Sequence, residues 1–368
     1  MNVLFVNATR KWGGEKTWAL DTALELERQG HHCTMVGRRG NRWTGACSQE
    51  GLAAHGLWFG FDFNPVPVWN LVRIIKKHSI ECVVVNISKD LRAGCIAGAI
   101  AGVPVVRHIG SSLDMDDRRI ERLLYRHFIA GMVVVGHRMK EELLERVPWV
   151  SPDMVKVVHL GKDHRRFTTK RTGRLKRELG LGDDTVLIGV TSQLVGGKGH
   201  GVLLEAFHSV AATRENSALV LVGEGFLREE LESTVARLGL AGRVFFAGFQ
   251  RDIPEVLSNL DLYVLPSFAE GFPNTLVEAM ACGLPCVSTD VSCVPEILAD
   301  GENGYLVSPG DAEGLARALG SLSDDGELRR RFGNEARRQV ERAFTLRDKA
   351  AEFVEYLEAV VNANADAD

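Results

Sequence analysis

The sequence lacks several features that would place it at once in a broad class of protein. It contains no run of about 18 apolar residues, so no membrane-spanning helix is expected. The chain begins with an apolar run of only about six residues before Thr9 and Arg10, which predicts a buried first strand and not a signal peptide. Residues 190–201 match neither the G-x-G-x-x-G pattern nor the P-loop pattern. We therefore expect a cytoplasmic protein without these two nucleotide-binding loops.

Patterns of disulfide and zinc-binding cysteines are also missing. The seven cysteines are odd in number, include no Cys-x-x-Cys and lie mostly in apolar stretches, which predicts reduced and mostly buried thiols. The spacings of Cys282, Cys286 and Cys293 fit no common zinc motif. The sequence therefore gives no reason to expect a metal site.

The composition that is present is that of a globular protein. Hydrophobic residues make up 45% and charged residues 25% of the chain, which argues against a disordered body. A chain of 368 residues exceeds one ordinary core and favours two domains. Residues 1–165 carry 23 Lys and Arg against 17 Asp and Glu, whereas the remainder carries 21 against 31. The basic half could face an anionic membrane surface or a phosphate-bearing substrate, or its charges could simply be solvated.

Short β-branched runs alternate with amphipathic stretches along the chain. The runs are almost entirely apolar, as expected for parallel strands covered by helices on both faces. The predicted strands are Val3–Asn7, Cys33–Val36, Cys82–Asn86, Val105–Ile109, Met132–Val135 and Val155–His159, then Val186–Thr191, Leu219–Val222, Val244–Ala247, Leu262–Pro266, Pro285–Ser288 and Tyr305–Val307.

The pattern predicts an α/β protein with two doubly wound domains that face a central cleft. The first domain is expected over 1–165 and the second over 166–345, with the Arg-, Lys- and Gly-rich stretch 165–184 as a linker followed by a short helix. An amphipathic helix over 346–361 is expected to pack back across the hinge. The small, polar residues 362–368 are expected to form a disordered tail.

The segment 266–285, PSFAEGFPNTLVEAMACGLP, contains most of the predicted chemistry. A buried strand is expected to end before it, and a short helix to follow with Asn274 as N-cap and Gly283 in the left-handed position after its end. The free N–H groups at the start of such a helix suit a diphosphate. Glu270 and Glu278 could accept hydrogen bonds from sugar or ribose hydroxyls, or they could be a solvated loop residue and an ordinary helix acid.

This segment resembles the Glu-x7-Glu signature of the retaining GT-B glycosyltransferases of group 1 (family 4). The resemblance implies the GT-B fold of two Rossmann-like domains, with Glu270 at the donor sugar as a catalytic residue and Glu278 at the nucleotide ribose. It implies that the backbone from Gly271 to Leu276 holds the diphosphate and sugar. The matching residues are Pro266, Ser267, Glu270, Gly271, Phe272, Glu278, Ala279, Met280, Ala281, Gly283 and Pro285, and the implied binding residues are Gly271, Phe272, Pro273, Asn274, Thr275, Leu276 and Glu278.

Two further loops resemble parts of the same family. In 190–199, VTSQLVGGKG, Lys198 matches a lysine that neutralises the donor diphosphate, while Gln193 stands where the family usually has Arg. Gly13 and Gly14 match a loop that opens onto the donor phosphates and the acceptor, although a simple strand-to-helix turn would look the same. Gly161-x-Asp163 matches the family's pattern at the end of its first domain. The resemblance implies that these residues have a packing role there and not a chemical one.

The family usually has a histidine near the donor sugar at the end of a strand in the first domain. His108 is the candidate here, although alignment on Pro104 puts Gly110 at that position, and a structural histidine is the alternative. Arg107 and Asp114 are further candidates. The two candidates His108 and Gly110 are two residues apart and would share one face of the strand.

The resemblance implies transfer of a sugar from a nucleotide-sugar donor to the hydroxyl of a glycan or glycolipid acceptor, with retention and without a cofactor or metal. Asp114-x-Asp116 has metal-site spacing but lies in an expected loop. The basic amphipathic stretch 117–128 could lie on the inner membrane face or pack as a solvated helix. No nucleic-acid partner is expected. The alternatives are a non-catalytic nucleotide-sugar-binding subunit, favoured by Gln193, and an epimerase or phosphorylase of similar fold.

Overall fold

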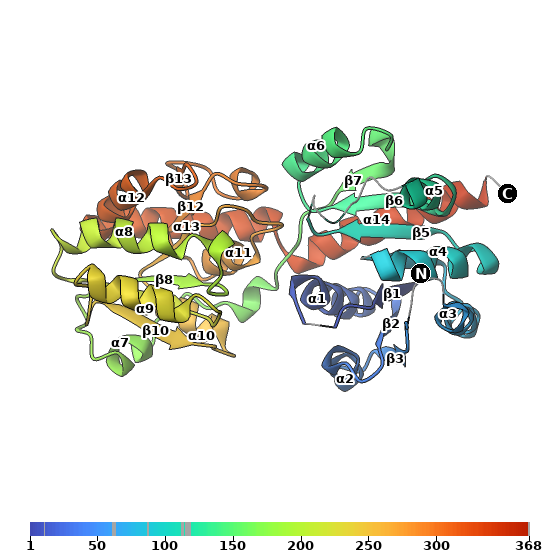
Figure 1. Cartoon of the computed structure of the whole chain (residues 1–368), viewed down its shortest axis with the longest axis horizontal. Helices are drawn as coiled ribbons and strands as arrows, with labels where there is room; N and C mark the ends of the chain where they lie inside the picture. Colours follow the sequence, from blue (N-terminus) through green and yellow to red (C-terminus); the bar gives the residue numbers. More distant parts are fainter. Residues whose placement is uncertain (11, 61–63, 87, 112–113, 115–118, 367–368) are drawn as a thin grey trace. The chain divides into compact units, whose positions relative to one another are not determined.

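The computed structural model describes residues 1–10, 12–60, 64–86, 88–111, 114 and 119–366. The chain forms two compact units, one of Met1–Gly161 with Leu346–Asp368 and one of Lys162–Thr345. Each unit contains a parallel sheet with helices around it (Figure 1). The predicted α/β class with two doubly wound domains is confirmed, and the cleft stays a prediction.

The first unit is built on a seven-stranded sheet in the order β3-β2-β1-β4-β5-β6-β7. All neighbouring strands pair in parallel, and the middle strands are buried on both faces, which explains their apolar sequences. The elements are β1 (Asn2–Asn7), α1 (Gly14–Arg28), β2 (His32–Arg38), α2 (Arg42–Gln49), β3 (Ala53–Leu57), α3 (Pro65–Lys77), β4 (Cys82–Val85), α4 (Ser88–Ala101), β5 (Val105–Ile109), α5 (Arg119–Phe128), β6 (Ile129–Val134), α6 (His137–Arg146), η2 (Pro152–Met154) and β7 (Val155–Val157).

The C-terminal helix α14 (Leu346–Ala365) belongs to the first unit. Phe353 and Leu357 join the same buried cluster as Val3 and Phe5, and α14 lies beside α1 and β6 (Figure 1). The expected disorder over 362–368 is wrong for 362–365, because α14 continues to Ala365. Alanine extends an existing helix at little cost, so this end stays helical. Residues 367–368 lie outside the described part of the chain.

The second unit is built on a six-stranded parallel sheet in the order β10-β9-β8-β11-β12-β13. Its division from the first unit falls between Gly161 and Lys162, while the sequence suggested 165/166. The elements are η3 (His164–Arg166), α7 (Arg174–Glu178), β8 (Val186–Thr191), η4 (Gly196–Lys198), α8 (His200–Ala211), β9 (Ser217–Val222), α9 (Arg228–Arg237), β10 (Val244–Gly248), α10 (Ile253–Ser258), β11 (Leu262–Leu265), α11 (Asn274–Ala281), β12 (Cys286–Thr289), η5 (Val294–Glu296), β13 (Gly304–Val307), α12 (Ala312–Asp324) and α13 (Gly326–Ala343).

Both sheets reverse their strand order next to their first strand. The reversal lies between β1 and β4 in the first unit and between β8 and β11 in the second. In doubly wound sheets, ligands bind outside the carboxyl ends of the strands at this switch point, where the two following loops diverge. The loops that follow β8 and β11 are therefore the expected ligand-binding loops of the second unit.

Replacing Gly131 by alanine should weaken the packing of α14 on β6. A methyl group added at Gly131 would lie 2.1 Å from the Tyr356 hydroxyl and 3.0 Å from the ring carbon that bears it. We expect Gly131→Ala to lower the free energy of unfolding by about 1–3 kcal/mol, the usual cost of overpacking, measured by urea denaturation.

The control for this variant is Gly45→Ala on α2, where an added methyl group meets no atom within 4 Å. It should be neutral or slightly stabilising, because alanine favours a helix over glycine. In a Tyr356→Leu background, Gly131→Ala should cost less than in the wild type. An equal cost in the two backgrounds would show that the helix does not pack as described.

Candidate functional site

Two loops of the second unit converge at its switch point. Lys198 follows β8 and Glu270 follows β11, and the Lys198 Nζ lies 2.7 Å from the Glu270 Oε1. Only 28% of the lysine side chain and 10% of the glutamate side chain are exposed. The structure therefore brings together two residues that the sequence assigned separately to the diphosphate and to the sugar.

Glycine at position 199 allows this approach. Gly199 has φ of +69°, and a methyl group added to it would lie 1.9 Å from the Pro266 carbonyl oxygen. A side chain would therefore clash with backbone in addition to straining the left-handed conformation. The Phe268 N–H also donates to the Gly197 carbonyl (2.9 Å), which ties the two loops together.

The Glu270 loop is held by hydroxyl groups. The Ser267 Oγ donates to the Glu270 Oε1 (2.6 Å), the same oxygen that Lys198 contacts. The Ser292 hydroxyl donates to the Glu270 carbonyl, and the Thr289 hydroxyl donates to the Ser267 carbonyl, each at 2.6 Å. The sequence matched Ser267 to the family pattern but gave it no role. The fixed loop presents the Glu270 carboxylate with one oxygen already bonded.

Helix α11 begins differently from the prediction. Its N-cap is Pro273, which makes no side-chain capping bond, so the prediction of Asn274 as N-cap is wrong. The fixed φ of proline suits a helix start, and proline has no N–H to satisfy. The predicted left-handed Gly283 after the helix is confirmed, with φ of +70°.

Not every predicted amide of 271–276 is available to a ligand. Pro273 has none, and the N–H groups of Asn274 and Leu276 already donate to Phe272 and Pro273 carbonyls. Within the described chain, the Gly271 and Thr275 N–H groups have no partner among the protein atoms. Because no side chain caps the helix, its N-terminus keeps unpaired donors, which is the usual basis of an anion site.

The other predicted residues near this loop differ in their burial and in their contacts. The Leu276 side chain is fully buried, and Phe272 is buried with its ring 6.4 Å from that of Phe344. Glu278 lies one turn into α11, and its Oε1 is 2.8 Å from the Nζ of Lys162, a residue that the sequence did not assign. Gln193 has an exposed side chain beside the β8 loop.

In the first unit, Gly13 is the N-cap of α1 and Gly14 its first residue. Gly13 has φ of −153°, which any residue adopts, and a methyl group added there would meet no atom within 4 Å. Neither backbone strain nor packing therefore requires glycine at position 13. The open space around it is compatible with the predicted close approach of a ligand.

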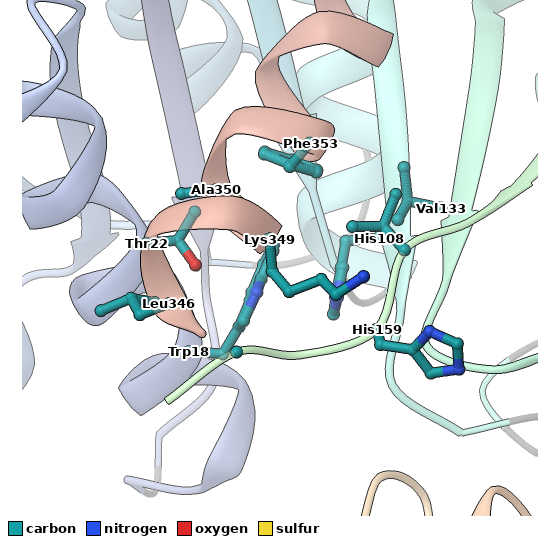
Figure 2. Close-up of a pocket in the computed structure, with 11 residues that line it drawn as sticks. Trp18, Thr22, His108, Val133, His159, Leu346, Lys349, Ala350 and Phe353 are labelled. Atoms are coloured by element: carbon teal, nitrogen blue, oxygen red, sulfur yellow. The ribbon is translucent and has the colours of Figure 1, made fainter. Parts of the chain in front are cut away.

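His108 lies in the interior of the first unit, with 1% of the residue exposed (Figure 2). Its ring stacks on Trp18 at 3.5 Å between ring centroids, and its Nδ1 lies 3.2 Å from the Asn86 side-chain nitrogen. The Nε2 atom is buried without a partner among the described residues, beside a small pocket lined by Trp18 and Phe353. Burial lowers the pKa of His108 to about 3, so the ring is neutral.

Glu15 is a residue that the sequence did not assign. It follows Gly14 on α1, and a methyl group added at Gly110, the position aligned with the family histidine, would lie 3.4 Å from its Oε1. Burial and the negative charge of Asp114 raise the pKa of Glu15 to about 7, against the opposing effect of Arg107. A charged residue directly after a Gly-Gly pair is the signal that could have identified it.

All seven cysteines are free and buried. Among the residues that the structure describes, no group of three or more His, Cys, Asp or Glu side chains is arranged to hold a metal ion. No helix in the described segments is long and apolar enough to cross a membrane. Asp116 of the Asp114-x-Asp116 pair and residues 117–118 of the basic stretch lie outside the described residues.

Two protein families match this chain by sequence. The family described as "Glycosyl transferases group 1" matches residues 172–339, and "Glycosyltransferase Family 4" matches residues 12–166. The first covers the loops of Lys198 and Glu270, and the second covers most of the first unit.

Curated relatives are similar over part of their length. N-acetyl-alpha-D-glucosaminyl L-malate synthase of Bacillus anthracis is 33% identical over 58% of this chain and 55% of its own length. UDP-Gal:alpha-D-GlcNAc-diphosphoundecaprenol alpha-1,3-galactosyltransferase of Escherichia coli is 26% identical over 80% of this chain and 79% of its own. The chain thus spans about half the length of the first relative.

Solved structures agree with this chain over almost its whole length. Anabaena HepE in complex with UDP has a TM-score of 0.87 at 23% identity, covering 98% of this chain and 100% of that one. A glycosyltransferase from Rickettsia africae also has a TM-score of 0.87, at 19% identity, with 98% of each chain covered. At these identities the agreement shows the fold.

The raised pKa of Glu15 predicts how stability depends on pH. The folded pKa of about 7 lies above the ordinary value of 4.5, so the unfolded chain loses this proton at a lower pH than the folded protein does. The free energy of unfolding therefore falls as pH rises from about 4.5 to 7. Removing the titration in Glu15→Gln should therefore stabilise the protein more at pH 8 than at pH 5, relative to the wild type. Urea denaturation of both proteins at the two pH values measures this, and a pH-independent difference would contradict it.

Proposed function

We propose that this chain, which matches the group 1 glycosyltransferases over residues 172–339, transfers a glycosyl group from a nucleoside-diphosphate sugar to an acceptor hydroxyl. The observation that carries this proposal is the meeting of Lys198 and Glu270 at the switch point of the second sheet. A cation, free helix amides and a carboxylate that accepts hydrogen bonds are the groups that a diphosphate linked to a sugar requires.

Each group has a distinct role in this proposal. Lys198 and the amides of Gly271 and Thr275 neutralise the charge that grows on the departing diphosphate, which stabilises the transition state. Glu270 accepts hydrogen bonds from the donor sugar, and Glu278 accepts them from the ribose. The buried side chains of Phe272 and Leu276 support the loop by packing.

The proposed reaction proceeds with retention, as the family resemblance implies. The bond between the anomeric carbon and the phosphate oxygen breaks, and a bond from the acceptor oxygen forms on the same face of the sugar. The acceptor hydroxyl proton passes to the departing phosphate oxygen. The transition state has oxocarbenium character, so the diphosphate leaves with the electron pair of the broken bond.

The acceptor is proposed to be a glycan or glycolipid of a cell-surface polysaccharide or lipopolysaccharide. One similar protein is named for an acceptor linked to diphosphoundecaprenol, which supports a lipid-linked acceptor. A cytoplasmic location at the inner membrane face suits such an acceptor, with the basic helix α5 as the predicted contact. For His108 we propose a packing role beneath Trp18, because of its burial.

A non-catalytic nucleotide-sugar-binding subunit is the competing proposal. It is favoured by the exposed neutral side chain of Gln193, where the family usually supplies a second cation. Slow hydrolysis of a bound donor by the wild type, lost in Glu270→Ala, would favour the enzyme. Binding of a donor with neither hydrolysis nor transfer would favour the subunit.

Nucleoside diphosphates and their sugar conjugates should raise the melting temperature of the protein. A ligand that binds only the folded state stabilises it by about 2.7 kcal/mol at a concentration of 100 times its Kd. A thermal-shift screen with UDP, GDP, ADP and their sugars should therefore identify one nucleotide. No shift with any of them would contradict the proposed function.

The two residues of the ion pair should respond differently to substitution. Lys198→Met should weaken binding of the identified nucleoside diphosphate and lower transfer, because the cation for the diphosphate is lost. Glu270→Gln should lower transfer by about 100-fold or more and leave nucleoside diphosphate binding nearly unchanged, because its partner is the sugar. Isothermal titration and a transfer assay measure the two effects. Asp324→Asn, in an exposed ion pair with Arg214, serves as the control and should change neither.

A further inference from the structure

A buried lysine contacts the carboxylate assigned to the ribose. The Lys162 Nζ lies 2.8 Å from the Glu278 Oε1, with 10% of the lysine side chain and 17% of the glutamate side chain exposed. Lysine is rarely buried without a charged partner, and the loss of one member of such a pair leaves the other charge uncompensated. The pair is therefore a built feature of the second unit and not a surface contact.

The backbone fixes the position of Lys162. Its N–H donates to the Phe344 carbonyl (2.9 Å), and Lys162 forms a parallel bridge with Thr345. The Phe344 ring lies 6.4 Å from that of Phe272, which is in the loop before α11. Lys162 is therefore anchored by a segment that also packs against the proposed donor loop.

The charges around α11 explain why a cation is needed at this position. Glu278 lies one turn from the free N–H groups of the helix start, where the proposed diphosphate binds. Two anions so close together repel each other unless one is neutralised. Lys162 contacts one carboxylate oxygen, which leaves the other oriented and able to accept hydrogen bonds from hydroxyl groups.

We propose that Lys162 is a positioning residue of the nucleotide site, which holds the Glu278 carboxylate so that it accepts the ribose hydroxyls. This inference rests on the proposed function. Lys162 acts through Glu278 and does not touch the ribose itself. Its effect on binding therefore appears only when the nucleotide has ribose hydroxyls.

The test compares a nucleotide with and without those hydroxyls. The probes are the nucleoside diphosphate that gives the largest thermal shift and its 2′,3′-dideoxy analogue, with each Kd measured by isothermal titration. The wild type should prefer the ribose form by about tenfold or more, the range of a hydrogen bond to a charged group. Lys162→Met and Glu278→Gln should each remove most of this preference, and the double variant should remove no more than Glu278→Gln alone.

The second unit offers a matched control. Lys176 forms a similarly buried ion pair, 2.9 Å from Asp261, with 13% and 10% of the two side chains exposed. Lys176→Met makes the same substitution away from α11 and should keep the ribose preference. Lys162→Arg keeps the positive charge and should also keep most of it, which tests the inference even where Lys162→Met folds poorly.

Each outcome separates this inference from the proposed function. If Lys162→Met weakens binding of both nucleotides equally, or keeps the ribose preference that Glu278→Gln loses, the positioning role is overturned and the proposed function stands. If the wild type binds no nucleoside diphosphate, the proposed function fails, and this inference fails with it.

Discussion

The second unit depends on the reversal of strand order between β8 and β11. Adjacent parallel strands point the same way, so the loops that leave them start side by side. Residues 72 positions apart in the chain thus form the Lys198–Glu270 ion pair. The contact also requires Gly199, because a side chain there would overlap the Pro266 carbonyl. Sheet topology and one glycine together determine where a cation can meet a carboxylate.

Charge pairing is the second constraint on this site. A region that binds a diphosphate would normally exclude acidic side chains, yet Glu270 and Glu278 both lie beside the start of α11. Each contacts one lysine, Lys198 or Lys162, through a single carboxylate oxygen. The acids can therefore remain near an anion and still accept hydrogen bonds from hydroxyl groups. In the proposed function, these two pairs are what lets the acids lie beside a bound diphosphate.

In the first unit, burial changes the pKa values of two neighbouring side chains. His108 and Glu15 both lie near the carboxyl end of β5, but burial drives their pKa values in opposite directions. The histidine loses its proton and packs under Trp18, whereas the glutamic acid holds its proton to about neutral pH. Of these two side chains, Glu15, which adjoins Gly110, is the one with its pKa near neutrality.

Local sequence patterns determined most of the elements, because buried parallel strands such as β8 and β11 must be apolar throughout. Strand β3, with the sequence AAHGL, was missed because alanine and glycine give no strand pattern. The spacing of Glu270 and Glu278 and the family pattern around them were also readable from the sequence. The contacts of Lys162 and Glu15 and the burial of His108 were decided by tertiary structure alone. Their partners lie far away in the chain, and desolvation depends on everything packed around a group, which no local pattern records.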